Sequence, residues 1–331
     1  MTVHYFTRKP RRGNYSIERI FSDVVPALPA PLKGVIIEMP VESSGIWNRL
    51  KMMLWSAGRQ GDINHVTGDI HFVDLLMKSQ KTILTIHDCG FVEKAGGVKR
   101  WLLKKLWMEW PVSKAALITT VSESSKREIV ELTRCDADQV KVVHNYVSDR
   151  FSPGESKIRS EKFRILQIGT KPNKNLDRLV SAIKGLDIQL VVIGILSTEQ
   201  KDLLVRQGIN YENHTDLDED QLVDVYRSVD LLASVSLEEG FGLPILEAQK
   251  TGIPVLTSNV SAMPEVAGEG AKLVSPVDEG EIRKAIRELM SNGSLREHLI
   301  EKGFRNANKF TLERTVQGYV QVYRQLKQMN N

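Results

Sequence analysis

The sequence predicts an α/β protein of two domains, each built on a parallel sheet. Apolar runs of strand length alternate with amphipathic segments along the whole chain. This alternation is typical of parallel sheets that helices cover on both faces. The chain has 331 residues, which suits two domains of about 150 residues each. A polar stretch near the middle marks where the two domains join.

The expected strands fall into two series, one on each side of that stretch. The first series comprises residues 34–37, 82–86, 116–121 and 140–143, and the second comprises 164–168, 189–193, 231–235 and 254–257. Helical patterns between them include 122–132 and 175–186. We therefore expect an N-terminal domain over 1–150, a linker over 151–161 that contains Pro153 and Gly154, a second domain over 162–310, and a terminal helix over 311–331.

Composition excludes several classes of protein. Hydrophobic residues make up 41% and charged residues 26% of the chain, as in ordinary globular proteins. The net charge of +4 is too small to indicate nucleic-acid binding. Cys89 and Cys135 have no metal-type spacing and predict a reducing, cytoplasmic compartment. No apolar run has the length of a signal peptide core or a membrane span.

The most informative segment is 236–256, which reads SLEEGFGLPILEAQKTGIPVL. A buried strand leads into the turn Gly240-Phe241-Gly242, and Pro244 suits the start of a helix that Gly252 ends. The N-terminus of such a helix favours a diphosphate. Glu239 in the turn and Glu247, expected on the first helical turn, could each accept hydrogen bonds from a sugar diol. Two glutamates at this spacing alone are more often solvated surface, but the full string is far more specific.

This string resembles the signature of the retaining glycosyltransferases of family 4. After EGFGLPILEA come Gly252-Ile253-Pro254-Val255 and then Pro264-Glu265. The resemblance implies the GT-B fold, in which two Rossmann-like domains face a central cleft and the last helix crosses back to the first domain. It also implies a nucleotide-sugar donor, no cofactor and no metal, with donor contacts from Gly240, Phe241, Gly242, Leu243 and Glu247.

The loop 169–175 follows the strand 164–168 and supplies cations for a leaving diphosphate. Loop lysines are usually only solvated, but Lys171 and Lys174 lie between a strand and a helix. The segment resembles the family's G…KN loop, which often adds an arginine that is missing here. The resemblance assigns the conserved lysine's role to Lys174, with Gly169 beside it, and suggests Lys171 in place of the arginine.

His87 follows the strand 82–86, at a strand end where sites form. A lone histidine is more often structural, but this one resembles the family's histidine that contacts the donor sugar. The basic loop 8–15 resembles the family's glycine loop near the acceptor and implies contacts from Arg12, Gly13 and Asn14. A solvated basic tail is the competing interpretation.

The expected chemistry is transfer of a sugar with retention of the anomeric configuration. Breaking the bond between the anomeric carbon and phosphate builds negative charge on the diphosphate, which Lys174 would stabilise. Glu239 would act on the transferred sugar, and His87 would lie at the reacting centre. The sequence leaves the base, the sugar and the acceptor open. A sugar-nucleotide epimerase and a non-catalytic sugar-nucleotide-binding subunit are the alternatives.

The segment from Lys99 to Trp110 predicts a basic helix rich in tryptophan. Leu102, Leu103, Leu106, Trp107 and Trp110 share one arc of a helical wheel, which core packing explains, and Trp101 lies away from it. A basic helix with exposed tryptophan also suits peripheral contact with the inner face of an anionic membrane. A lipid-linked acceptor for surface polysaccharide synthesis would fit such contact.

Overall fold

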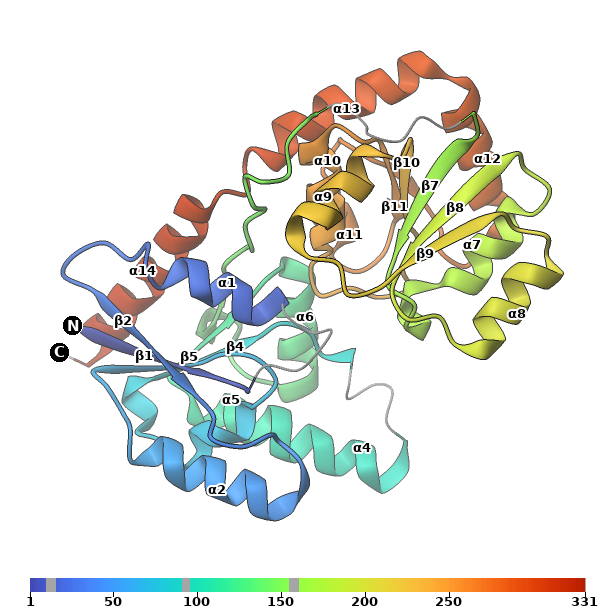
Figure 1. Ribbon diagram of the computed structural model, residues 1–331. Coiled ribbons are helices and arrows are strands. Elements are labelled where there is room, and N and C mark those ends of the chain that lie inside the picture. Colours follow the sequence, from blue (N-terminus) through green and yellow to red (C-terminus); the bar gives the residue numbers. More distant parts are fainter. Residues whose placement is uncertain (10–15, 91–95, 155–160, 331) are drawn as a thin grey trace. The chain divides into compact units, whose positions relative to one another are not determined.

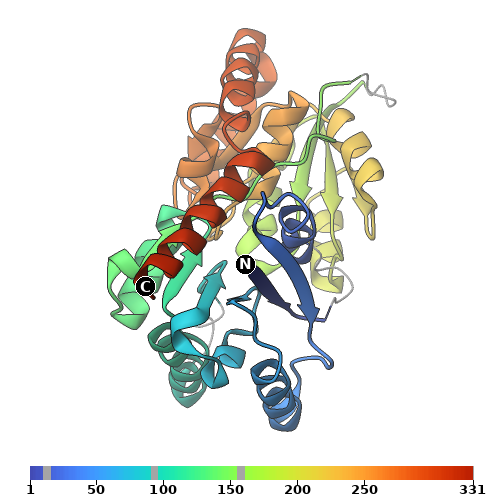
Figure 2. The ribbon, with the colours of Figure 1, turned by 90° about the vertical axis from the view of Figure 1, so that its left-hand side faces the viewer.

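The protein forms two compact units in a computed structural model that describes residues 1–9, 16–90, 96–154 and 161–330 (Figures 1 and 2). The first unit combines Met1–Tyr146 with Leu312–Asn331, and the second comprises Val147–Thr311. Phe151, in the first part of the stretch that the sequence marks as a linker, is fully buried against Tyr226 of the second unit.

The first unit is built on a six-stranded parallel sheet with the strand order β2-β1-β3-β4-β5-β6. In chain order these strands are β1 (Thr2–Thr7), β2 (Lys33–Glu38), β3 (Ile63–Val66), β4 (Thr82–Ile86), β5 (Leu117–Thr120) and β6 (Val140–Val142). The chain starts in the interior of the sheet and builds outward on both sides of β1. The order therefore reverses between β1 and β3.

Helices cover both faces of this sheet (Figure 1). One face packs against α1 (Ser16–Val24) and α14 (Leu312–Met329), around a core that includes Tyr5, Phe21 and Tyr323. The core of the other face includes Phe6, Leu84 and Met108. The elements of that side are α2 (Gly45–Ala57), η1 (His71–Leu76), η2 (Ser79–Lys81), α4 (Gly97–Leu103), η3 (Lys104–Glu109), α5 (Trp110–Lys114), α6 (Glu123–Thr133) and η4 (Ala137–Gln139).

The second unit has the same plan, with the strand order β12-β11-β10-β7-β8-β9. These strands, again all parallel, are β7 (Phe163–Ile168), β8 (Ile188–Ile193), β9 (Tyr211–His214), β10 (Leu231–Ser234), β11 (Val255–Ser258) and β12 (Lys272–Val274). Here the first strand is β7, and the order reverses between β7 and β10.

Contacts between helices divide those of the second unit into two layers. The first layer contains α7 (Leu176–Ile183), α8 (Thr198–Arg206) and α12 (Glu279–Ser291). The other contains α9 (Glu219–Arg227), α10 (Leu243–Thr251), α11 (Met263–Ala267) and α13 (Gly293–Ala307). The short 3-10 turn η5 (Pro172–Lys174) joins β7 to α7. Two six-stranded parallel sheets, each with helices on both faces, are the GT-B architecture that the sequence predicts.

Each expected strand is present, within one or two residues of its predicted ends. Four strands were missed: β1, β3, β9 and β12. They are short or carry polar side chains, such as Asn64 and His65 in β3, so no apolar run in the sequence indicates them. In β3 both polar side chains are nevertheless fully buried, because partners from β4 and α14 satisfy them.

The segment from Lys99 to Trp110 is helical, but the predicted apolar arc is wrong in part. The helix widens to a π-helix over Lys104–Glu109, which adds about one residue per turn and shifts the phase of the side chains. Trp107 packs against Phe72, whereas Leu102 and Trp110 are exposed together with Trp101. Among the described residues, no helix combines the length and apolarity needed to cross a membrane.

Candidate active site

The second unit has a natural ligand position at the reversal of its strand order. In open parallel sheets, ligands bind outside the carboxyl ends of the strands where the order reverses. Here those strands are β7 and β10, which pair directly through Ile165 and Leu231. The loop 169–175 follows β7, and the turn 235–242 follows β10. The two segments that the sequence singles out are therefore neighbours.

Gly169 shapes the loop after β7. Its φ is +87°, and a Cβ atom there would lie 2.9 Å from Cγ of Lys174. A side chain at this position would therefore be strained and would also displace the lysine. The missing side chain leaves room for the Lys174 stem to lie across the start of the loop, so the glycine and the lysine depend on each other.

Lys174 and Glu239 form an ion pair between the two segments. Nζ of Lys174 lies 2.6 Å from Oε1 of Glu239, and the side chains are 19% and 14% exposed. Oγ of Ser236 donates a second hydrogen bond to the same oxygen, at 2.7 Å. Because the pair is largely shielded from water, its charges interact more strongly than those of a surface salt bridge. Both predicted catalytic groups of this unit are thus brought together.

The backbones of the two segments are also joined. The amide of Leu237 donates to the carbonyl of Asn173 at 2.8 Å, and Nδ2 of Asn173 donates to the carbonyl of Glu238 at 3.2 Å. Asn175, in the left-handed conformation at φ +59°, donates from its buried side chain to the carbonyl of Val235 at 2.9 Å. These bonds hold Lys174 opposite Glu239 in a defined geometry.

Two further residues that the sequence did not single out support the site. Ser261 bonds both ways to the backbone of Glu239: its Oγ donates to the carbonyl at 2.8 Å and accepts from the amide at 3.3 Å. Gln167 donates from Nε2 to the carbonyls of Gly169 and Lys174, at 3.2 and 3.1 Å. Neither residue belongs to a recognisable motif. The partner of Ser261 is distant in sequence, and Gln167 bonds to backbone carbonyls, which every residue carries.

The turn Gly240-Phe241-Gly242 leads into α10. Gly242 caps the helix with φ +100°, a conformation that favours glycine, and Leu243 is the first helical residue. The unpaired amides of such an N-terminus can bind an anion. The side chain of Phe241 is buried against Phe310, with ring centroids 5.9 Å apart. Its ring therefore belongs to the core, and only its backbone could meet a donor.

Glu247 lies farther along α10 than predicted. The helix begins at Leu243, so Glu247 is its fifth residue and opens the second turn rather than lying on the first. Its carboxylate accepts a hydrogen bond of 2.7 Å from the hydroxyl of Tyr226 on α9. Burial raises the pKa of Tyr226 well above its usual value, with a further contribution from Glu247, so the tyrosine stays a donor.

Lys171 differs from Lys174. It precedes the η5 turn and is exposed, and its side chain is not part of the Lys174–Glu239 pair. The described residues include no group of three or more His, Cys, Asp and Glu side chains placed to hold a metal ion. The expectation that the chemistry needs no metal stays a prediction.

The first unit places His87 at the carboxyl end of β4, two strands from β1. Burial, aided by His71 and Arg8, lowers the pKa of His87 to about 3, so its imidazole is neutral near pH 7. Nε2 of His87 is buried and has no hydrogen-bond partner among the described residues. This neutral ring therefore keeps one nitrogen unpaired, as a group that hydrogen-bonds a sugar hydroxyl would.

Arg8 and Asp69 mark the reversal of strand order in the first unit. Arg8 follows β1 and Asp69 follows β3, and their side chains form a salt bridge of 3.2 Å. Neither was predicted as a site residue, because the sequence did not indicate β1 or β3 as strands. Arg12, Gly13 and Asn14, the predicted acceptor contacts, lie outside the described residues.

Comparisons with known proteins agree with this geometry. The O-antigen chain mannosyltransferase B of Escherichia coli is 32% identical over 235 residues, which cover 64% of this chain. The match spans only 61% of that relative's length. By fold, the chain is similar to a glycosyltransferase from Rickettsia africae, with a TM-score of 0.76, 18% identity and 98% of both chains covered. It is also similar to HepE of Anabaena, with a TM-score of 0.81 and 14% identity, over 97% of this chain and 99% of that chain.

A sequence profile locates the family resemblance in the second unit. The profile described as Glycosyl transferases group 1 matches residues 148–306, which include Lys174, Glu239 and Glu247. This match and the fold agree, and the second unit of the chain therefore belongs to the glycosyl transferases group 1 family.

Proposed function

We propose that this protein transfers a sugar from a nucleoside-diphosphate sugar to a glycan or lipid-linked acceptor, with retention at the anomeric carbon. The observation that carries the proposal is the shielded Lys174–Glu239 pair where the strand order reverses. The bond between the anomeric carbon and the phosphate oxygen breaks, and an acceptor hydroxyl oxygen bonds to that carbon. The acceptor's proton goes to the leaving diphosphate. No cofactor takes part.

The donor's diphosphate would lie between Lys174 and the N-terminus of α10. Negative charge builds on it as the bond breaks, and a preorganised lysine beside helix amides stabilises such charge. Glu239, which now pairs with the lysine, would turn to hydroxyl groups of the transferred sugar. Glu247 would bind the ribose, with the Tyr226 hydroxyl holding its carboxylate in place. Lys171, being exposed, would have a smaller part.

The first unit would supply the acceptor side. The Arg8–Asp69 salt bridge lies at the end of its sheet, and His87 of the same unit would contact the donor sugar through its neutral ring. Arg12, Gly13 and Asn14, which follow in the sequence outside the described residues, are proposed as further acceptor contacts.

The relatives suggest which substrates to test first. The solved HepE structure holds UDP and glucose, which supports a nucleotide-sugar donor. The O-antigen chain mannosyltransferase B supports mannose as the sugar and a surface polysaccharide as the product. We therefore propose nucleoside-diphosphate mannose and glucose as first donors.

The proposal includes peripheral contact at the cytoplasmic face of the membrane through the segment from Lys99 to Trp110. Trp101 is exposed there, as such contact requires. Lys104 and Lys105 both pair with Glu109, however, which offsets part of their charge. Arg100, which is exposed, would then carry more of the attraction to anionic lipid.

Release of nucleoside diphosphate, followed with each donor and an acceptor, tests the proposal. Glu239→Gln should lower turnover roughly 100-fold or more, because the transferred sugar loses a charged partner, while affinity for the sugar-free nucleotide stays nearly intact. The neighbouring Glu238→Gln is the matched control and should retain activity. A chelator should leave the wild-type rate unchanged.

Four results would contradict the proposal. Equal losses in the Glu238 and Glu239 variants would make the effect structural. Activity that a chelator abolishes and magnesium restores would overturn the metal-free chemistry. Conversion of one sugar nucleotide into another without any acceptor would favour the epimerase, and tight nucleotide binding without turnover on any donor would favour a binding subunit.

A further inference from the structure

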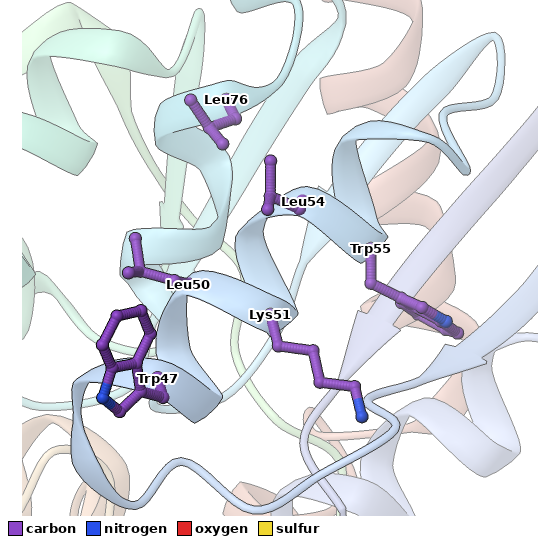
Figure 3. A pocket seen from close by; sticks show the side chains of 6 residues that line it. All are labelled: Trp47, Leu50, Lys51, Leu54, Trp55 and Leu76. Atoms are coloured by element: carbon purple, nitrogen blue, oxygen red, sulfur yellow. The ribbon is translucent and has the colours of Figure 1, made fainter.

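Helix α2 presents a row of large apolar side chains to solvent. Ile46 is 68% exposed, Trp47 80% and Leu54 66%, and Leu50 lies between them and is also exposed. Figure 3 shows Trp47, Leu50 and Leu54 following one another along one side of the helix, with Leu76 of η1 near them. Together these side chains line a shallow surface hollow.

This row is not accounted for by the packing of α2. The helix turns only Met52 and Ser56 fully inward, and its exposed apolar residues recur at intervals of three or four positions. That spacing makes one continuous stripe along a helix. An isolated exposed apolar residue needs no explanation, but a contiguous patch of this kind marks an interaction surface.

The charged residues of α2 and of the turn that follows it are all positive. Residues 43–61 contain Arg49, Lys51 and Arg59 and no acidic residue. The guanidinium of Arg59 lies over the ring of Trp55 at 4.1 Å, and Lys51 is exposed. Tryptophan and leucine flanked by cations on an amphipathic helix are the features of helices that lie in the interface of an anionic bilayer.

A second exposed apolar segment adjoins the stripe. The guanidinium of Arg49 lies over the ring of Trp107 at 4.6 Å, which ties α2 to η3. Val98 and Trp101 of α4, which leads into η3, are exposed. Figures 1 and 2 both place α2 and α4 at the same end of the first unit. Both helices thus present exposed apolar side chains at that end of the unit.

We propose that the α2 stripe, formed by Ile46, Trp47, Leu50 and Leu54, docks this protein on an anionic lipid bilayer, with the helix lying in the interface. A second copy of the chain is the less favourable occupant. In a two-fold contact the same patch faces itself, and Arg49, Lys51 and Arg59 would meet their own copies. Anionic headgroups instead complement these cations. This inference rests on the membrane contact of the proposed function, for which it names a further surface, but it does not depend on the sugar transfer.

Vesicle flotation tests the docking without any sugar donor. The full chain is mixed with phosphatidylcholine vesicles that contain or lack phosphatidylglycerol. We expect it to float with the anionic vesicles only and to be released by high salt. Trp47→Ser with Leu54→Ser should weaken partition about tenfold or more, because two strongly exposed contacts with the acyl region are lost. Lys51→Glu should weaken it further.

Helix α8 of the second unit supplies the matched controls. Val205→Ser removes an exposed apolar side chain, and Lys201→Glu reverses an exposed charge, in each case away from α2. These variants should float like the wild type. All variants should keep the wild-type melting temperature, because each changed side chain is exposed.

Several outcomes would overturn the inference. One is wild-type protein that ignores anionic vesicles at low salt, and another is a Trp47 and Leu54 double variant that floats as well as the wild type. A third is a dimer, measured by light scattering, that this double variant converts to monomer, since the stripe would then be an interface between copies. Because flotation needs no turnover, failure here leaves the proposed transfer standing, and the reverse also holds.

Discussion

Lys174 and Lys171 lie three residues apart in one loop, yet their surroundings differ. Lys174 is shielded and bonded to Glu239, whereas Lys171 is exposed. A cation helps most in a fixed, water-poor position. We therefore expect Lys174→Ala to lower kcat roughly 100-fold or more and Lys171→Ala to lower it only a few-fold.

Steady-state kinetics on the two variants would decide between the lysines. Comparable losses of kcat would show that Lys171 moves to the diphosphate when the donor binds, as its suggested role in place of the family's arginine requires. A wild-type rate for Lys174→Ala would remove that lysine from the mechanism. Melting temperatures should accompany the rates, because Lys174→Ala also leaves the partly buried Glu239 without its cation.

At the residue scale, the sequence indicates which side chains belong to the candidate site but not which of them meet or what holds them. Lys174 and Glu239 are predictable because each belongs to a local pattern of strand, glycine turn and helix. Ser261 and Tyr226 belong to no such pattern. Each bonds to a residue some twenty positions away in the sequence, and the sequence does not show that the two come together. Supporting residues of this kind require the three-dimensional structure.

At the element scale, α9 and α10 form a unit that fixes Glu247. The hydroxyl of Tyr226 on α9 donates to the Glu247 carboxylate at 2.7 Å. Tyr226→Phe keeps the ring and its contact with Phe151 but removes this bond. We expect nucleotide affinity to fall by about 0.5–1.5 kcal/mol, the usual range for one hydrogen bond, with a smaller change in kcat.

Isothermal titration with a nucleoside diphosphate, together with KM and kcat, checks this expectation. A positioning role raises KM for the donor and leaves kcat nearly constant. A fall in melting temperature without any change in affinity would mean that the bond stabilises the fold only. In that case the ribose assignment of Glu247 would lose its structural support.

The sequence fails to predict how side chains are placed around the axis of two helices in this chain. Glu247 was expected on the first turn because Pro244 commonly opens a helix, but α10 begins one residue earlier, and the carboxylate lies on the second turn. The π-helix over Lys104–Glu109 has no signature in the residues themselves. Trp107 packs inward as predicted, but Trp110, which follows the widened turn, is exposed. A helical wheel assumes a constant rotation per residue, and one widened turn invalidates it.

At the scale of the whole molecule, the first unit should be the acid-sensitive one. Burial is the main cause that lowers the pKa of His65 and of His87 to about 3, and it also lowers that of His71. Below about pH 6.5 the unfolded chain then binds more protons than the folded one. The stability that these neutral histidines contribute is complete above that pH and is lost as pH falls toward 3.

The size of the effect makes it measurable. Each histidine contributes up to about 1.4 kcal/mol per pH unit within that window. Burial raises the pKa of Asp74, so this carboxyl group makes the folded unit more stable as pH falls. One such group opposes three histidines, and we expect the histidines to determine the net change in stability. All five tryptophans lie within the first 110 residues, so their fluorescence reports on the first unit.

Urea unfolding followed by this fluorescence should show a lower midpoint at about pH 5.5 than at about pH 7. Asp74→Asn should steepen the dependence, because the opposing group is gone. A midpoint that is constant or rises on acidification would contradict the expectation. It would mean that the three histidines are not neutral in the folded unit.

The first unit is assembled from both ends of the sequence. Helix α14 closes one face of its sheet, and the Tyr323 hydroxyl bonds to Tyr5 at 2.7 Å and to His65 at 2.8 Å. During translation, that face stays open until residues near Leu326 have left the ribosome. The second unit needs nothing beyond Thr311. Translation adds about 5–20 residues per second, so the first unit stays incomplete while residues 147–311 are being made. A nascent-chain chaperone would therefore bind within the first 146 residues.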